Sequence, residues 1–240
     1  MSAPGPTRWK GRAASAAPAA RRRSPVVTID GPAGGGKSTV ARRLAERLGY
    51  TYLSSGAIYR VVAWRTRGGT LLAAVLARAQ IEFRGRPTDQ RVLVDGQDVT
   101  EALGAPEVSE LAATLSQRPE VRAFADEIQR RIAAAGPVVV EGRDAGTVVF
   151  PQADCKFYLD ASLEARTRRR LGDHRARGEG LTPEAVREAL AARDVADRTR
   201  TLAPLTRTPD ATYIDSSALT VDEVVERMAE AVERACSTRS

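Results

Sequence analysis

The segment 31–38 has the residue types and spacing of a phosphate-binding loop. It reads Gly-Pro-Ala-Gly-Gly-Gly-Lys-Ser and matches the pattern G-x-x-x-x-G-K-[S/T] at every fixed position. In such a loop, backbone N–H groups surround the phosphates of a nucleoside triphosphate, the lysine reaches the β- and γ-phosphates, and the serine hydroxyl ligates Mg²⁺. The residues expected to bind the triphosphate are Gly31, Pro32, Ala33, Gly34, Gly35, Gly36, Lys37, Ser38 and Thr39, with Ser38 as the metal ligand.

The residues on both sides of this loop predict the elements that hold it. The apolar run 26–30 is typical of a short buried strand, and 39–48 has helical spacing with Val40, Leu44 and Leu48 on one face. A strand, a glycine loop and a helix in this order direct backbone N–H groups and the positive end of the helix toward one point. The pattern indicates nucleotide binding and leaves open what the nucleotide is used for.

A second group of candidate residues, Gly142-Arg143-Asp144, follows an apolar strand predicted at 138–141. In an open parallel sheet the carboxyl ends of the strands face the ligand crevice, so Arg143 and Asp144 are expected to face a substrate. The alternative is a structural ion pair, because charged residues in such positions also serve the fold.

A third group is a run of arginines on a predicted helix that begins near residue 162. Helical spacing places Arg166, Arg169 and Arg170 together on this helix. The arginines expected to be solvated instead are Arg168, Arg175 and Arg177.

A fourth group, Arg193, Asp197 and Arg200, is expected on one helical face, with two guanidinium groups around a carboxylate. Guanidinium groups bind phosphate oxygens bidentately and stay charged, so this number of arginines suits a cleft that holds a triphosphate beside a phosphorylated acceptor. Phosphoryl transfer is catalysed mainly by positioning and electrostatics, and an anionic acceptor needs no strong base. The residues therefore predict a small P-loop kinase with a phosphorylated acceptor.

The order of the predicted elements indicates an α/β fold, a P-loop NTPase with a parallel central sheet flanked by helices. Besides the strands already named, strands are expected at 50–53, 80–83, 91–94, 155–159 and 211–214. A turn is expected at 54–56, and helices are expected at 57–67, 98–103, 106–116 and 119–134. Thr182-Pro183 and a capping box from Thr220 to Glu223 predict the starts of two later helices.

Composition limits the class of protein. The 240 residues, 42% hydrophobic and 28% charged, suit one globular domain with a sizeable core. No apolar run is long enough to span a bilayer, and no signal-peptide core is visible. Cys155 and Cys236 lack metal-ligand spacing, which favours a reducing, cytoplasmic compartment, with Cys155 buried in a strand. The single histidine, His174, is expected to be solvated rather than to act as a base or zinc ligand.

The net charge of +7 would by itself indicate a nucleic-acid partner, but its distribution argues against one. Residues 1–25 hold six basic residues and no acidic residue, so the rest of the chain is nearly neutral. The segment 1–24 is rich in Ala, Pro, Ser and Arg and is expected to be a disordered basic tail. A transit peptide or a weak anion-binding arm are the alternatives.

Five segments of the chain form a specific set. They are 31–39, 55–60 (Ser-Gly-Ala-Ile-Tyr-Arg), 95–100 (Asp-Gly-Gln-Asp-Val-Thr), 142–151 (Gly-Arg-Asp-Ala-Gly-Thr-Val-Val-Phe-Pro) and 193–204. In composition, order and spacing this set resembles the bacterial cytidylate kinase family, which is similar to adenylate kinases in fold. The resemblance covers about residues 25–235, and the run 142–151 is much more specific than the phosphate loop.

The resemblance implies transfer of the γ-phosphoryl group of ATP to CMP or dCMP with Mg²⁺, by a cytoplasmic monomer that binds neither nucleic acid nor membrane. The kinase domain would span 25–240, with a monophosphate-binding insertion at about 57–135 and a lid at about 166–182. The residues implied to be catalytic are Lys37, Arg143, Arg169, Arg193 and Arg200. The residues implied to bind the acceptor are Ser55, Tyr59, Arg60, Arg122, Arg143, Asp144, Arg193, Asp197 and Arg200.

The resemblance also implies a role for each acceptor residue. Arg122 and Asp144 suit the cytosine edge, because a carboxylate accepts from the N4 amine and a guanidinium donates to O2 and N3. Arg60 and Arg143 suit the acceptor phosphate. The residues implied to surround the ribose and the phosphates are Tyr59, Arg193 and Asp197, with Arg200 on the phosphate side. The lid residues implied to close over the transferring group and exclude water are Arg166, Arg169 and Arg170.

Four positions depart from the family pattern. They are Ser54 in place of Asp, Gly104 in place of Arg, Ala113 in place of Ser, and Ala145 in place of Met. The alternative functions are a P-loop kinase of another acceptor such as UMP or AMP, a nucleotide-dependent RNA- or DNA-binding protein, and a pseudo-kinase that binds nucleotide without transfer. The neutral charge of residues after 25 argues against the second, and Lys37, Arg143 and Arg200 argue against the third.

Overall fold

The computed structural model of the protein describes residues 24–176 and 178–237. The predicted basic tail, apart from its last residue, and Arg177 therefore lie outside the described residues.

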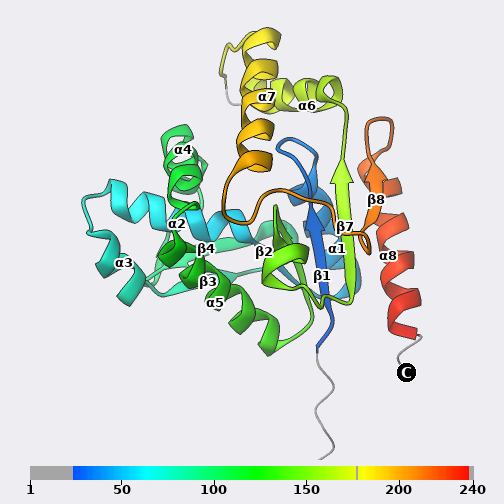
Figure 1. The fold of residues 1–240 in the computed structure, drawn as a ribbon, viewed down its shortest axis with the longest axis horizontal. Helices are drawn as coiled ribbons and strands as arrows, with labels where there is room; N and C mark the ends of the chain where they lie inside the picture. Colours follow the sequence, from blue (N-terminus) through cyan, green and yellow to red (C-terminus); the bar gives the residue numbers. More distant parts are fainter. Residues whose placement is uncertain (1–23, 177, 238–240) are drawn as a thin grey trace, which may run out of the picture.

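A parallel sheet forms the centre of the described structure (Figure 1). Its strands are β1 (Val26–Asp30), β2 (Thr51–Ser54), β6 (Val138–Gly142), β7 (Cys155–Asp160) and β8 (Thr212–Asp215), in the order β2-β6-β1-β7-β8. Every pair of neighbouring strands is parallel, which confirms the prediction from the alternation of strands and helices. All residues of β1 and β6 are buried, as expected where helices cover both faces of a sheet.

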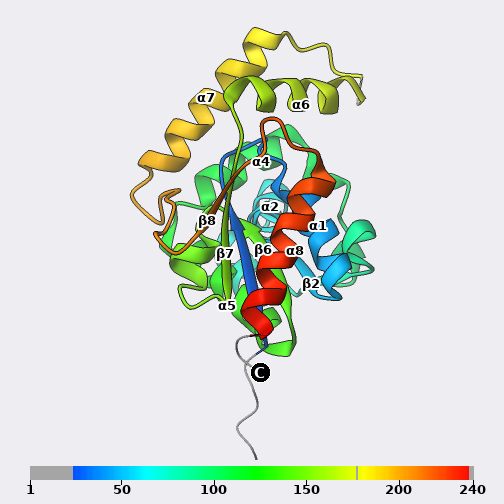
Figure 2. The same cartoon turned by 90° about the vertical axis from the view of Figure 1, so that its right-hand side faces the viewer.

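Helices cover both faces of the parallel sheet. Each face has its own apolar cluster, because successive residues of a strand point to opposite sides of the sheet. Val27 and Ile29 pack with α1 (Lys37–Leu48) and α8 (Val221–Ser237) on one face. Val26 packs on the other face in a cluster that includes α2 (Ser55–Arg67), α4 (Pro106–Leu115) and α5 (Pro119–Ala135). Seen from the side, α8 lies along the face that α1 also covers (Figure 2).

The segment between α2 and α4 holds a small antiparallel sheet of β3 (Ile81–Arg84), β4 (Arg91–Val94) and β5 (Gln97–Asp98). The strands predicted at 80–83 and 91–94 are confirmed to within one residue. The helix predicted at 98–103 is wrong, since Asp98 ends β5 and only the short turn η2 (Ala102–Gly104) follows. The Asp98 carboxylate accepts hydrogen bonds from the backbone N–H and the hydroxyl of Thr100. These bonds form a local turn that competes with a helix.

Helix α3 (Leu72–Arg78), which follows α2, was not predicted. The short 3₁₀ helix η1 (Pro87–Asp89) joins β3 to β4, where the sequence predicts a polar turn between the two strands. Helix α3 buries Val75, and Leu72, Leu76 and Ala79 pack partly buried against the same apolar cluster. Their spacing is helical, a signal in the sequence that the prediction did not use.

The helix starts that rest on capping residues are confirmed. Thr182 accepts the Ala185 N–H at 3.2 Å before α7 (Pro183–Thr199). Thr220 and Glu223 exchange reciprocal hydrogen bonds before α8. The turn predicted at 54–56 is wrong, because α2 begins at Ser55 directly after β2.

Helices α6 (Leu163–Ala176) and α7 lie beyond the end of the sheet toward which β1 and β7 point (Figure 1). This is the edge where the carboxyl ends of parallel strands meet, so it is the place to look for a ligand site. Within residues 24–176 and 178–237, no helix has the length and apolar character needed to cross a membrane.

Candidate active site

The phosphate loop connects β1 to α1 in a conformation that requires glycine. A Cβ atom on Gly31 would lie 2.0 Å from the carbonyl oxygen of Leu159, and Gly36 has φ 87°, in the left-handed region. Helix α1 begins at Lys37, two residues earlier than predicted, with Ser38 and Thr39 exposed in its first turn. The N–H groups of a first helical turn have no partner within the helix, so they are available to an anion.

Lys37 is buried inside this loop, and its ammonium donates to the carbonyl oxygen of Pro32 at 2.6 Å. Burial lowers the pKa of Lys37 to about 7, and the positive charge of Arg143 acts in the same direction. Glu141 and Asp30 oppose this shift without cancelling it. A bound triphosphate would restore the charged form of the lysine, because an opposite charge at close range favours ionisation.

Glu141, near the end of β6, is the main functional candidate that the sequence reasoning missed. Its Oε1 accepts from the hydroxyl of Ser54 at 2.7 Å, of Ser38 at 3.0 Å and of Tyr52 at 3.4 Å. Burial alone would raise the pKa of Glu141, but the charge of Lys37 and the Ser54 hydrogen bond outweigh it and lower the pKa. The signal in the sequence is an acidic residue near the end of an apolar strand, directly before Gly142-Arg143-Asp144.

Ser38 and Glu141 together fit a magnesium ion. Both supply hard oxygen ligands, and Mg²⁺ is commonly bound by one or two protein oxygens together with phosphates and water. No group of three or more His, Cys, Asp and Glu residues in the described parts of the chain is arranged as a metal site. Oxygen ligands beyond these two would therefore have to come from the nucleotide and from water.

Asp197 on α7 is held between two guanidinium groups. Arg143 approaches it at 2.7 Å and Arg193 at 3.3 Å. Burial would raise the pKa of Asp197, but these arginines outweigh burial and lower it. The expectation that Arg200 shares this face is wrong, because Arg200 follows the last residue of α7 with an extended backbone and turns away from the helical face.

Arg200 lies instead against Asp144, with 3.2 Å between Nη2 and Oδ1. The other carboxylate oxygen of Asp144 pairs with Arg122 of α5, and all three side chains are 8% exposed. The guanidinium carbon of Arg122 also lies 5.9 Å from the ring centre of Tyr59. Residues from three separate parts of the chain thus form one buried charged cluster.

Ser55 and Arg60 come from α2, beside this cluster. The Ser55 hydroxyl donates to the Glu141 carbonyl oxygen at 2.9 Å, which ties the start of α2 to β6. Burial lowers the pKa of Arg60, with Glu141 acting in the opposite direction. Arg60 is half-buried, and the positive charge of Arg143 also lowers its pKa.

The three arginines expected to act together in the lid are in different environments. Arg169 donates to the Ser216 hydroxyl at 3.1 Å and lies close to Gly36 of the phosphate loop. Arg170 is exposed, as Arg168 is. The guanidinium of Arg166 is buried, lies 2.7 Å from Asp194 and donates to the Ala33 carbonyl oxygen at 3.2 Å.

His174 is not solvated as expected, since its side chain is 13% exposed and its Nδ1 lies 2.6 Å from Glu179. Cys155 lies at the start of β7 and is half-buried rather than buried.

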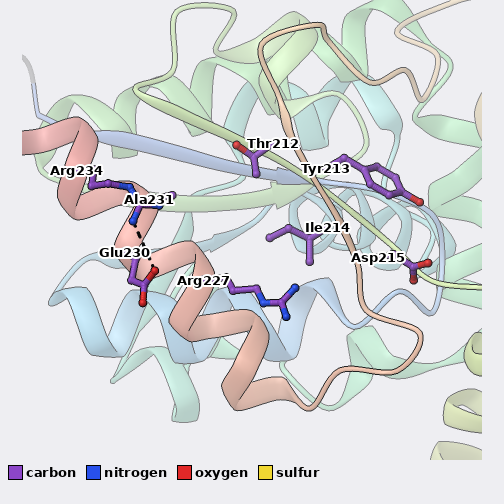
Figure 3. Close-up of a pocket in the computed structure, with 8 residues that line it drawn as sticks. All are labelled: Thr212, Tyr213, Ile214, Asp215, Arg227, Glu230, Ala231 and Arg234. Atoms are coloured by element: carbon purple, nitrogen blue, oxygen red, sulfur yellow. Dashed lines mark ion pairs between the residues drawn. The ribbon is translucent and has the colours of Figure 1, made fainter.

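A hollow of about 480 Å³ lies between β8 and α8 (Figure 3). Its walls are Thr212, Tyr213, Ile214 and Asp215 of β8 and Arg227, Glu230, Ala231 and Arg234 of α8. None of the predicted site residues lines it, so the candidate site is the cluster around the phosphate loop and Asp144.

The complete phosphate loop after the first strand of a parallel sheet, with arginine–carboxylate pairs around it, defines the class of P-loop kinases. Within that class the chain belongs to the cytidylate kinase family, whose model matches residues 27–234. The resemblance identified in the sequence is therefore confirmed.

Curated relatives support the same assignment. The cytidylate kinase of Geobacter sulfurreducens is 44% identical over 217 residues, which cover 88% of this chain and 93% of that protein. The cytidylate kinase of Carboxydothermus hydrogenoformans is 42% identical, covering 87% of this chain and 97% of that protein. A crystal structure of an uncharacterized protein from Eubacterium ventriosum shares the fold, with a TM-score of 0.52 at 11% identity over 87% of this chain and 98% of that one.

Proposed function

We propose that the protein transfers the γ-phosphoryl group of ATP to CMP or dCMP and releases ADP with CDP or dCDP. The observation that carries this proposal is the buried placement of Asp144 between Arg122 and Arg200, beside a complete phosphate loop. Membership of the cytidylate kinase family and the names of the curated relatives support it.

The donor side would bind ATP through residues 31–39, with Lys37 on the β- and γ-phosphates. Ser38 would hold Mg²⁺, and Glu141 would bind it directly or through its water ligands. When bound, the ion supplies positive charge that neutralises the phosphate oxygens. Arg169, which already lies beside the loop, would stabilise charge on the transferring group together with Arg143, Arg193 and Arg200.

The acceptor side would use Asp144 and Arg122 on the cytosine edge. A carboxylate accepts from the N4 amine of cytosine, whereas uracil presents a carbonyl oxygen there, and the resulting mismatch is unfavourable. Arg60 and Arg143 would bind the acceptor phosphate, with Ser55 close to them. The residues proposed around the ribose are Tyr59, Arg193 and Asp197.

Residues 57–135 would form the acceptor-binding segment and 166–182 a lid, within a kinase domain from 25 to 240. Arg166 would anchor the lid through Asp194 rather than reach the substrate. We propose further that the protein works as a cytoplasmic monomer without a nucleic-acid or membrane partner.

The test is an ADP-release assay of the purified protein with ATP, Mg²⁺ and each of CMP, dCMP, UMP, AMP and GMP. We expect turnover with CMP and dCMP and little with the others. Comparable turnover with UMP would mean that Ala113, where the family pattern has serine, relaxes selection for cytosine. Absence of turnover with every acceptor would overturn the proposal.

A further inference from the structure

Asp30 connects the phosphate loop to the residues proposed to bind the acceptor. It ends β1, directly before Gly31 of the phosphate loop, and is 5% exposed. Its Oδ1 accepts the Ala145 N–H at 2.9 Å and its Oδ2 accepts the Gly146 N–H at 2.7 Å. These two residues follow Arg143 and Asp144 directly, so one carboxylate connects the phosphate loop to the backbone that presents the acceptor residues.

The two N–H groups need this partner because they open the short π-helical turn η3 (Ala145–Val149). N–H groups in a first helical turn lack partners within the helix, and the residue before it commonly supplies a side-chain cap. Asp144 occupies that position here but makes no capping bond, because its oxygens are paired with Arg122 and Arg200. Asp30 replaces the missing cap from a neighbouring strand.

The close approach of the turn to β1 depends on Gly146. A Cβ atom on Gly146 would lie 2.7 Å from the Thr28 hydroxyl and 3.3 Å from Asp30 Oδ2. Thr28 lies two residues before Asp30 and points to the same side of the strand. Its hydroxyl is buried and has no hydrogen-bond partner, so of these two neighbours only Asp30 bonds to the turn through its side chain.

We propose that Asp30 is a positioning residue for the acceptor site, which holds Arg143 and Asp144 in place by accepting both N–H groups. This rests on the proposed function, in which Asp144 binds the acceptor base. Burial raises the pKa of Asp30 to about 6, and Asp144 acts in the same direction, while the two N–H bonds and Lys37 oppose it. At about pH 8 the carboxylate is therefore ionised, and both oxygens can accept.

The experiment compares Asp30→Asn with the matched control Thr28→Val, which changes the same face of the same strand without removing a hydrogen bond. Asn keeps the size of Asp but turns an NH₂ group toward an N–H group. Hydrogen exchange of residues 145–146 should become about tenfold faster in Asp30→Asn and stay unchanged in Thr28→Val, as expected for loss of one charge-assisted bond. The KM for CMP should rise about tenfold, while the KM for ATP stays within about twofold.

Unchanged exchange at 145–146 would overturn the proposal, and so would faster exchange with an unchanged KM for CMP. An equal rise in the KM for ATP would also overturn it, because Asp30 would then serve the phosphate loop. If the wild-type protein does not phosphorylate CMP, the proposed function has failed, and the exchange result separately reports whether Asp30 holds the turn.

A second variant keeps the test available if Asp30→Asn does not fold. Gly146→Ala leaves Asp30 intact but places a methyl group against the Thr28 hydroxyl, which displaces the Gly146 N–H. We expect the same selective rise in the KM for CMP. Adding Thr28→Ala should relieve the clash and restore most of the wild-type KM, and failure of both effects would contradict the positioning role.

Discussion

The donor and acceptor sides of the site are built in different ways. The donor side is one continuous segment, residues 31–39, whose backbone N–H groups and Lys37 come from a single strand–loop–helix unit. The proposed acceptor side consists of side chains from α2, α5, the loop after β6 and the region of α7. The comparison indicates that the proposed phosphate site depends on the local geometry of one segment, whereas the proposed recognition of the acceptor base needs distant residues to meet.

The two sides also differ in how their charges are compensated. Lys37 donates to a backbone carbonyl and has its pKa lowered, so it is ready to gain a proton and bind an anion. Arg122, Arg143 and Arg200 are already paired with Asp144 and Asp197. A buried charge is tolerated when it is paired, and the pairing orients the guanidinium groups before any substrate arrives.

Removal of Lys37 gives the strongest test of the donor side. Lys37→Ala should lower turnover by about 10²–10³-fold with little change in thermal stability, because a charge that stabilises the transition state is lost. The control is Arg43→Ala, an exposed residue on the same helix whose partner is Asp222. Wild-type turnover in Lys37→Ala, measured by ADP release, would contradict the assignment of the loop.

Arg166 connects the phosphate loop to α7. A substitution at this position tests whether the residue is needed for stability or for turnover. Arg166→Met should reduce the free energy of unfolding by about 3–5 kcal/mol, since it leaves Asp194 as an uncompensated buried charge. Urea unfolding measures this, and Arg168→Met on the exposed side is the control. If Arg166→Met keeps the wild-type free energy of unfolding but loses turnover, Arg166 acts in the lid during the reaction instead.

Loss of Asp144 should weaken acceptor binding more than ATP binding. Asp144→Ala is expected to raise the KM for CMP by about 10–100-fold and to leave the KM for ATP within about twofold, because a buried polar partner of the base is removed. Steady-state kinetics with each substrate varied measures both constants. Asp222→Ala, an exposed carboxylate paired with Arg43, is the control. A larger effect on ATP would place Asp144 on the donor side.

The smallest expected effect is a proton taken up on nucleotide binding. With its pKa near 7, Lys37 is mostly neutral at about pH 8, and the triphosphate favours the charged form. Binding should therefore take up part of a proton at pH 8 and less at about pH 6, where the lysine is already charged. Calorimetry in two buffers of different ionisation enthalpy measures this uptake. Lys37→Arg should abolish it, because arginine does not titrate in this range.

The residue patterns with local causes were predicted well. The phosphate loop, the strand before it and the capping of α7 and α8 follow from contacts between residues a few positions apart. Predictions that depended on extending a helical pattern were less successful. Arg200 leaves the face of α7, and the segment after Asp98 forms a turn in place of a helix.

By itself, the amino-acid sequence determined the class of protein, the nucleotide-binding loop and the parallel sheet, because glycine spacing, apolar runs and capping residues act over short distances. Only the tertiary structure decided which charges meet. In the folded structure Glu141 accepts a hydrogen bond from Ser38, and Arg166 pairs with Asp194. Asp30 accepts the Ala145 N–H of the turn that follows Asp144. These partners are far apart in the chain, and the order of parallel strands, which sets their distances, is a property of the whole packed sheet.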